Sequence, residues 1–247
     1  MEERSSIQLK GVKVDVPSTS SSSSATDLEN SLAKRSVYSI SVTAIDLVNH
    51  VLVICVTVFI LGYSLRSFEV MNLHVTLCTL GYVLLMSEAI VVLAGESILT
   101  NFLTRRAKSH VHWVLQVLGL ICTVAGVVVM YRVKTVHFRS VHALLGIASV
   151  ITMVLLAVCG YPVFIAAKLR NLIRPVIIKF GHNLLGICCF VLGMASQCYG
   201  YQKGWLPYVS KVPNVQCICI ILTALITVLS LRGALPSLVR QLITMLR

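Results

Sequence analysis

The segments VHALLGIASV (residues 141–150) and GHNLLGICCF (residues 181–190) decide the fold of this chain. Each opens a long apolar run with a histidine and a glycine four residues apart, His142 with Gly146 and His182 with Gly186. A spacing of four returns to the same face of a helix. Because an ionisable ring is costly inside a membrane helix, its repetition indicates two membrane helices with a functional histidine each.

The composition extends this interpretation to the whole chain. Of 247 residues, 57% are hydrophobic and only 12% are charged, which is more apolar than a soluble domain. Apolar runs of about 20 residues are long enough to cross a bilayer as helices. The short connections between them favour antiparallel neighbours. We therefore predict an all-α membrane protein with six transmembrane helices, at residues 44–65, 73–94, 110–131, 141–161, 180–200 and 215–231.

The two ends of the chain differ from this membrane region. Residues 1–40 are polar and Ser-rich and are expected to form a disordered tail. Their start, MEERSS, is acidic and leads into no apolar core, so we expect no cleavable signal. The predicted organisation is a tail at 1–40, a six-helix domain at 41–232 and a short C-terminal tail at 233–247.

Basic residues predict the orientation in the membrane. Fifteen Lys and Arg residues fall on the side of the two termini and six on the other side. Lys and Arg are enriched in cytosolic loops, so both termini, including the C-terminal tail, are expected in the cytosol. The net charge of +12 could suggest nucleic acid as a partner, but these cations are scattered in loops and helix flanks. Lipid, and not nucleic acid, is the predicted environment.

Four of the seven histidines lie near the beginnings of four consecutive predicted helices, at His74, His112, His142 and His182. Since neighbouring helices are antiparallel, alternate beginnings share a membrane face. His74 and His142 are therefore expected on the non-cytosolic side, and His112 and His182 on the cytosolic side. The topology predicts two histidine pairs, one near each surface.

Haem is the group that such pairs suit best. A structural zinc ion needs four protein ligands at one point, whereas a pair supplies two. A porphyrin brings four nitrogens of its own, and two axial imidazoles fill the remaining positions, which suits electron transfer. Glycines four or seven residues after the histidines are expected to leave room for a flat ligand; they are Gly81, Gly119, Gly146 and Gly186.

Cationic clusters near both pairs are candidate substrate sites. Lys134, His137 and Arg139 lie just before His142, on the side where cations are scarce, and would suit an anionic electron partner. A simple flanking role for this cluster is the alternative. Before His112 stand three further cations, for which the positive-inside tendency is an equal explanation; they are Arg105, Arg106 and Lys108.

Glu88 is a carboxylate within the predicted second helix. It follows His74 by fourteen residues, nearly four helical turns, and so is expected on a similar face. It would accept a hydrogen bond from a haem-ligand ring or take up a proton on reduction, and packing as a neutral acid is the alternative. His50 is expected to be a polar packing residue, and His110 a loop-face residue.

Four segments together resemble the cytochrome b-561 family, most closely its domain-containing protein 2 branch. They are NLHVTLCTLGYVLLMSEA from Asn72, SHVHWVLQVLGL from Ser109, HFRSVHALLG from His137 and FGHNLLGICCFVLGMAS from Phe180. The resemblance covers about residues 44–231 and rests on the order and spacing of the motifs. Each motif alone is weak.

The resemblance implies an inner bundle of helices two to five that holds two haems b non-covalently. It implies a transmembrane reductase that passes electrons from cytosolic ascorbate to monodehydroascorbate or ferric chelates opposite. His112 and His182 would ligate the cytosolic haem, and His74 and His142 the other. The ascorbate site would use Arg105, Arg106 and Lys108. A homodimer, and an endomembrane (vesicle, lysosome or ER) or the plasma membrane, are the assembly and location compatible with it.

A non-redox multi-pass transporter or a membrane scaffold remains the alternative function. Transporters bind their substrates at broken helices or central charges. In this sequence Glu88 is the strong candidate for such a charge.

Overall fold

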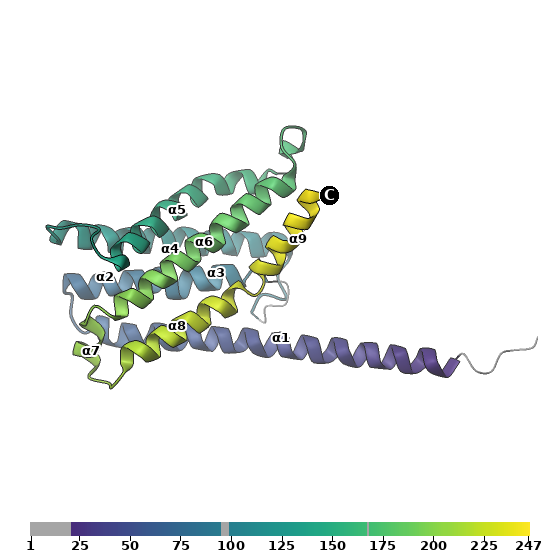
Figure 1. Cartoon of the computed structure of the whole chain (residues 1–247), viewed down its shortest axis with the longest axis horizontal. Coiled ribbons are helices and arrows are strands. Elements are labelled where there is room, and N and C mark those ends of the chain that lie inside the picture. Colours follow the sequence, from purple (N-terminus) through teal and green to yellow (C-terminus); the bar gives the residue numbers. More distant parts are fainter. Residues whose placement is uncertain (1–20, 95–98, 167) are drawn as a thin grey trace, which may run out of the picture. The chain divides into compact units, whose positions relative to one another are not determined.

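The computed structural model describes residues 21–94, 99–166 and 168–247. Throughout these ranges the regular structure is helical, without a strand (Figure 1). The chain divides into two units, Met1–Ser41 and Val42–Arg247, and the candidate site lies in the second. The helices are α1 (Ser21–Ser64), α2 (Val70–Cys78), the π-helix η1 (Thr79–Met86), α3 (Ser87–Val91), α4 (Arg105–Val133), α5 (Val141–Phe164), the 3₁₀-helix η2 (Lys168–Asn171), α6 (Pro175–Tyr201), α7 (Trp205–Ser210), α8 (Val215–Leu231) and α9 (Ala234–Leu246).

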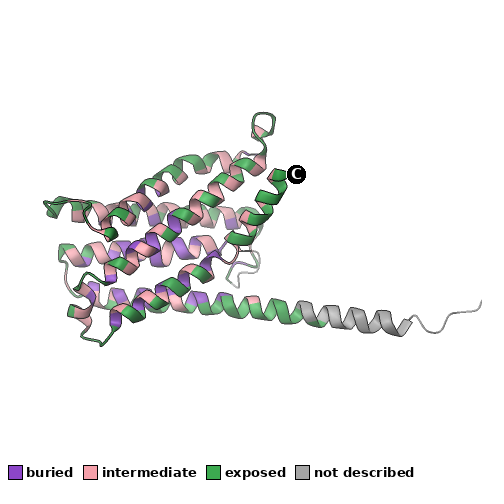
Figure 2. Ribbon diagram, in the orientation of Figure 1, coloured by how far each residue is buried: buried purple, intermediate pink, exposed green. Residues whose placement is uncertain are grey.

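Five helical spans are long and apolar enough to cross a membrane, and there are up to six if one bent pair counts as a span. The predicted all-α, multi-pass architecture is thereby confirmed. The sixth predicted helix is α8, which has only 17 residues. It qualifies together with α9, from which it is bent by 40°. Within the second unit, buried residues face neighbouring helices while exposed apolar residues line the outside, as expected for helices in lipid (Figure 2).

The predicted N-terminal tail differs from its expected form. Residues 1–20 lie outside the described residues, but from Ser21 onward the chain is helical, whereas disorder was expected up to residue 40. Pro17 and Gly62 bracket a stretch without a helix-breaking Pro or Gly, which lets α1 start early. The C-terminal tail is the helix α9.

Helix α9 packs on the first turns of α6. Arg174 donates hydrogen bonds to the last carbonyl groups of α9, those of Thr244 and Met245. Asn183 donates to the carbonyl oxygen of Ala234 at the start of α9. The polar contacts therefore hold both ends of α9.

Local signals fix where the histidine-bearing helices begin. The Thr104 side chain accepts a hydrogen bond from the backbone N–H of Ala107 and caps α4. The Ser140 side chain caps α5 in the same way through Ala143. A proline, Pro175, starts α6, a position that needs no N–H donor.

Glycines at two of the four expected positions serve helix packing. A Cβ atom on Gly81 would lie 3.0 Å from the carbonyl oxygen of Gly119, and one on Gly119 would lie 3.2 Å from that of Gly81. The two helices touch here through their backbones. A Cβ atom on Gly146 would lie 3.1 Å from the Ser196 hydroxyl oxygen, and one on Gly186 would meet nothing within 4 Å. The expectation of room for a flat ligand is therefore wrong for Gly81 and Gly119.

The π-helix η1 interrupts the second membrane helix for eight residues. Its wider turns advance each residue through a smaller angle than an α-helix does, so the residues after it are rotated relative to an uninterrupted helix. The Gln197 side chain donates to the carbonyl oxygen of Cys78 at the start of η1. In the middle of η1, the buried Tyr82 ring occupies the space where Gly193 has no side chain.

Candidate functional site

The rings of His74 and His142 face each other between α2 and α5. Their centroids are 6.0 Å apart and their planes are almost perpendicular, at 89°. His74 lies one turn into α2 and His142 is the second residue of α5. The topological prediction brought these two helix beginnings to the same side, and the structure places the two rings together.

Backbone carbonyl groups orient three of the four candidate rings. Nδ1 of His74 lies 2.9 Å from the Gly126 carbonyl oxygen, and Nδ1 of His142 lies 2.8 Å from that of Ser196. Nδ1 of His112 lies 2.6 Å from the carbonyl oxygen of Ala89. A carbonyl oxygen only accepts, so Nδ1 must carry the proton in each ring. Nε2 then keeps its lone pair, which is the form that binds a metal.

His112 of α4 and His182 of α6 are the histidines of the second predicted pair. Nδ1 of His182 is buried without a hydrogen-bond partner among the described residues. The same ring lies next to Gly160 of α5, where a Cβ atom would come 3.9 Å from Cε1 of His182.

The four histidines follow a reciprocal pattern in two antiparallel helix pairs. His74 at the start of α2 meets Gly126 near the end of α4, and His112 near the start of α4 meets Ala89 in α3. In the other pair, α5 and α6, His142 meets the far end of α6 and His182 meets the far end of α5. Each helix pair thus contributes one histidine to each ring pair.

A cavity of about 480 Å³ contains the His74–His142 pair. The predicted cations Lys134, His137 and Arg139 line it, and so does Lys203 from the segment after α6. Exposed basic side chains next to a buried cavity favour an anion at its mouth. Sequence reasoning missed Lys203, although its place on the cation-poor side was a usable signal.

Ring stacking orders the predicted cationic segment. The His137 ring stacks on Tyr131 with centroids 4.0 Å apart and planes at 21°. Phe138, next in sequence, has a positive φ of 52°, which turns the chain between α4 and α5. The imidazole of His137 is thereby held among the residues that line the cavity.

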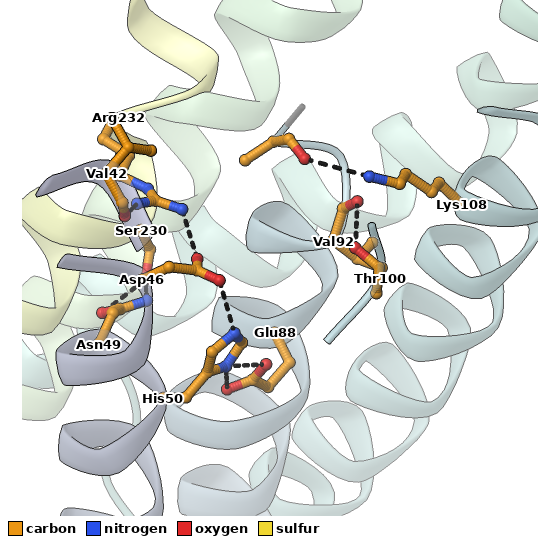
Figure 3. A network of polar contacts seen from close by, with 11 residues as sticks. Val42, Asp46, Asn49, His50, Glu88, Val92, Thr100, Lys108, Ser230 and Arg232 are labelled. Carbon is orange, nitrogen blue, oxygen red and sulfur yellow. Dashed lines mark hydrogen bonds and ion pairs between the residues drawn. The ribbon is translucent and has the colours of Figure 1, made fainter. Parts of the chain in front are cut away.

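The predicted cations at the start of α4 have two different environments. Arg105 and Arg106 are exposed, as a substrate contact or an interfacial residue would be. Lys108 is buried, and its Nζ donates to the Ala94 carbonyl oxygen at 3.5 Å (Figure 3). Lys108 therefore faces the end of the second membrane helix.

Glu88 binds His50 and not a candidate ligand. Both carboxylate oxygens lie within 2.9 Å of His50 Nδ1, as Figure 3 shows. The expected hydrogen bond to a ligand ring is therefore wrong for the three rings whose Nδ1 binds a carbonyl. A count of 3.6 residues per turn fails between His74 and Glu88 because η1 lies between them. His50, expected only to pack, is an ionisable partner.

Comparison with known proteins identifies the family. The pattern that describes eukaryotic cytochrome b561 matches residues 73–207, which include all four histidines. The chain belongs to the eukaryotic cytochrome b561 family. This confirms the resemblance drawn from the four sequence motifs.

Named relatives agree with this membership in the cytochrome b561 family. The human protein "Transmembrane reductase CYB561D2" is 26% identical over 196 residues, which are 74% of this chain and 85% of the relative. The mouse protein of the same name has the same identity and coverage. The mouse "Probable transmembrane reductase CYB561D1" is 24% identical over 115 residues, 45% of this chain and 50% of the relative.

The residues present fit the haem that the cytochrome b561 family implies. Two metal–nitrogen bonds of about 2 Å, plus about 1.2 Å from each nitrogen to its ring centre, add up to about 6.4 Å between imidazole centroids. The His74 and His142 centroids are 6.0 Å apart, slightly less than this sum. No cluster of three or more His, Cys, Asp or Glu side chains suited to a metal ion occurs in the described parts of the chain.

Proposed function

We propose that this chain is a transmembrane electron-transfer reductase with two haems b. It passes single electrons from cytosolic ascorbate to monodehydroascorbate or a ferric chelate on the other side. His112 and His182 hold the haem near the cytosol, and His74 and His142 hold the other. When bound, each haem supplies an iron that accepts and releases one electron.

The observation that carries this proposal is the state of the histidine rings. Three of the four have Nδ1 directed at a backbone carbonyl oxygen, which leaves Nε2 available as a ligand. Packing histidines have no need to share one tautomer or to pair across four helices. The names of the relatives, which call them transmembrane reductases, point in the same direction.

Two haem sites shorten the distance that an electron must cross in each step through the bilayer. A hydrocarbon core of about 30 Å is too thick for one useful electron-transfer step. Two histidine pairs, one near each surface, divide that distance. The apolar helices around both pairs exclude water, and burial together with the ring hydrogen bonds tunes the two haem potentials apart.

Substrate binding is assigned to the cations at the two ends. Lys134, His137 and Arg139, with Lys203, line the non-cytosolic cavity and attract an anionic acceptor. Arg105, Arg106 and Lys108 stand before the cytosolic histidine pair and serve the ascorbate anion. Arg105 and Arg106 are exposed for direct contact, whereas the buried Lys108 contributes its charge from the helix end.

Purified protein and sealed vesicles test the proposal. Pyridine haemochrome analysis is expected to give two haems b per chain, and fewer than one in folded protein would overturn it. Vesicles that contain the protein and trapped ascorbate are expected to reduce external ferric citrate. The His112→Ala/His182→Ala variant, which retains the outer pair, serves as the control and should not transfer electrons. Haem loading without any reduction by ascorbate would refute ascorbate as the donor.

A further inference from the structure

Four ionisable side chains, two of them buried and two partly buried, form a polar chain between α1, α3 and the end of α8, apart from the histidine pairs. Arg232 binds one oxygen of Asp46 and donates to the Val42 carbonyl oxygen at 2.9 Å. The other oxygen of Asp46 lies 3.3 Å from His50 Nε2. His50 Nδ1 meets the carboxylate of Glu88, so the order is Arg232, Asp46, His50, Glu88 (Figure 3).

The position of this polar chain is unusual for a purely structural contact. From residue 42 onward the sequence has four carboxylates, Asp46, Glu69, Glu88 and Glu96. Two of them, Asp46 and Glu88, belong to this polar chain of side chains. Ionisable groups within membrane helices are costly and mark functional sites. Stabilisation alone does not explain this arrangement, because the free-energy cost of removing charges from water is about as large as the gain from their attraction.

Glu88 is tied through one peptide unit to the cytosolic histidine pair. The next residue, Ala89, accepts the Nδ1–H hydrogen bond of His112. A cavity of about 180 Å³ is lined by Glu88 and His50 on one side and by Val111, the neighbour of His112, on the other. One peptide unit and a shared small cavity therefore connect Glu88 to the surroundings of His112.

The charges of the polar chain make Glu88 the group that responds. Asp46 is fully buried and already neutralised by Arg232. With a proton on both nitrogens of His50, the four charges sum to zero. Glu88 is the carboxylate with access, because 20% of its side chain is exposed and it faces the cavity. An added negative charge nearby favours the protonated acid.

We propose that Glu88 binds one proton when an electron arrives at the His112–His182 pair. The electron comes from the donor and the proton comes from cytosolic water, so the local charge does not change. When the electron moves on, the carboxylic acid releases its proton to the same side. This inference rests on the proposed function and adds a proton-binding site to it.

Other charges near Glu88 set its response. In the described part of the chain these are His50 and Asp46 of α1, Arg232 just after α8, and Lys108 of α4, whose Nζ donates at the end of the same membrane helix. With His50 protonated, three of these groups are cationic and Asp46 is anionic. An arriving electron is therefore an added negative charge close to Glu88.

Redox titration of each haem against pH tests the proposal. Because reduction takes up a proton, the midpoint potential of the haem held by His112 and His182 is expected to fall as pH rises. In Glu88→Gln, which keeps a hydrogen-bond acceptor for His50, that slope should shrink to less than half. The second haem should keep its wild-type behaviour in the same sample. Glu69→Gln, the same change at an exposed position, is the matched control and should match wild type.

Infrared difference spectroscopy of the wild-type protein tests the proposal independently of whether Glu88→Gln folds. Reduction is expected to produce a new protonated-carboxyl band, and its absence would overturn the proposal. Unchanged slopes in Glu88→Gln would do the same. If two haems are loaded in these samples, either result leaves the electron-transfer function standing. If no haem is loaded, both proposals fail.

Discussion

His74 and His142 come from helices separated by more than sixty residues of sequence, yet their rings are 6.0 Å apart and perpendicular. Each ring is anchored from behind by the carbonyl group of a third helix, His74 by Gly126 and His142 by Ser196. Four helices therefore cooperate in orienting one pair of side chains. The pair is the part of the structure from which the function follows most directly.

Replacing His142 with Ala is expected to remove one haem and leave the other. The variant deletes one of two axial ligands at the cavity pair, while His112 and His182 are untouched. Pyridine haemochrome analysis should fall from two haems per chain to one. His110→Ala is the matched control, since that ring stacks on Phe164 and belongs to neither pair. A full complement of two haems in His142→Ala would show that the pairing is wrong.

Neutralising the cations of the cavity is expected to weaken binding of an anionic acceptor. In Lys134→Gln/His137→Gln/Arg139→Gln, the Michaelis constant for ferric citrate should rise at least about fivefold, because each exposed charge contributes up to about 1 kcal/mol. The haem spectrum should not change. Lys211→Gln, an exposed lysine from the same side that does not line the cavity, should leave the constant unchanged. Equal constants in both variants would limit the cluster to a topological role.

A methyl group on Gly193 is expected to destabilise the bundle. Its Cβ atom would overlap the ring of Tyr82, which is buried and has no free space to enter. Overpacking of this kind costs about 1–3 kcal/mol, seen as a lower melting temperature in detergent. Gly181→Ala on the same helix meets nothing within 4 Å and should not lower it. Adding Tyr82→Leu to Gly193→Ala should restore part of the loss; no recovery would argue against this contact.

Removing Arg232 is expected to destabilise the protein more than removing an exposed arginine. Arg232→Met removes the arginine that pairs with the fully buried Asp46, and breaking a buried pair costs about 3 kcal/mol or more. Thermal unfolding in detergent measures the change, with Arg170→Met on η2 as the exposed control. The double variant Asp46→Leu/Arg232→Met should recover most of the loss. Equal melting temperatures for Arg232→Met and Arg170→Met would contradict a structural role for the pair.

Hydrophobic runs were enough to predict the membrane helices, and antiparallel topology was enough to predict that His74 and His142 lie on the same side, where their rings meet. These predictions depend on lengths and on which side of the membrane a residue lies, and both can be counted in sequence. The environment of Glu88 could not be predicted by counting residues. The π-helix η1 changes the angle between His74 and Glu88, and the residues between them carry no sequence signal for a π-helix. The contact of Gly81 with Gly119 likewise depends on how two helices meet, which the spacing of either glycine does not show.

The contacts of His50 also separate what sequence spacing can indicate from what depends on helix packing. Asp46 and His50 are four residues apart, so their contact on one helical face was readable in the sequence. Their partners Arg232 and Glu88 lie on other helices, and packing alone brings them there. Local spacing could therefore have indicated the contact with Asp46, but not those that depend on other helices.

The reciprocal pattern of the two helix pairs has a consequence for biogenesis. Neither pair of histidine rings is complete within one antiparallel pair of helices, because the partner of His74 lies on α5 and that of His112 on α6. During synthesis both histidines of the first pair are in the membrane once α5 has entered, but the Ser196 carbonyl that orients His142, like His182 of the second pair, arrives only with α6. Cofactor loading must then come late in translation or after it, and a chain arrested before residue 175 would lack a residue of each site.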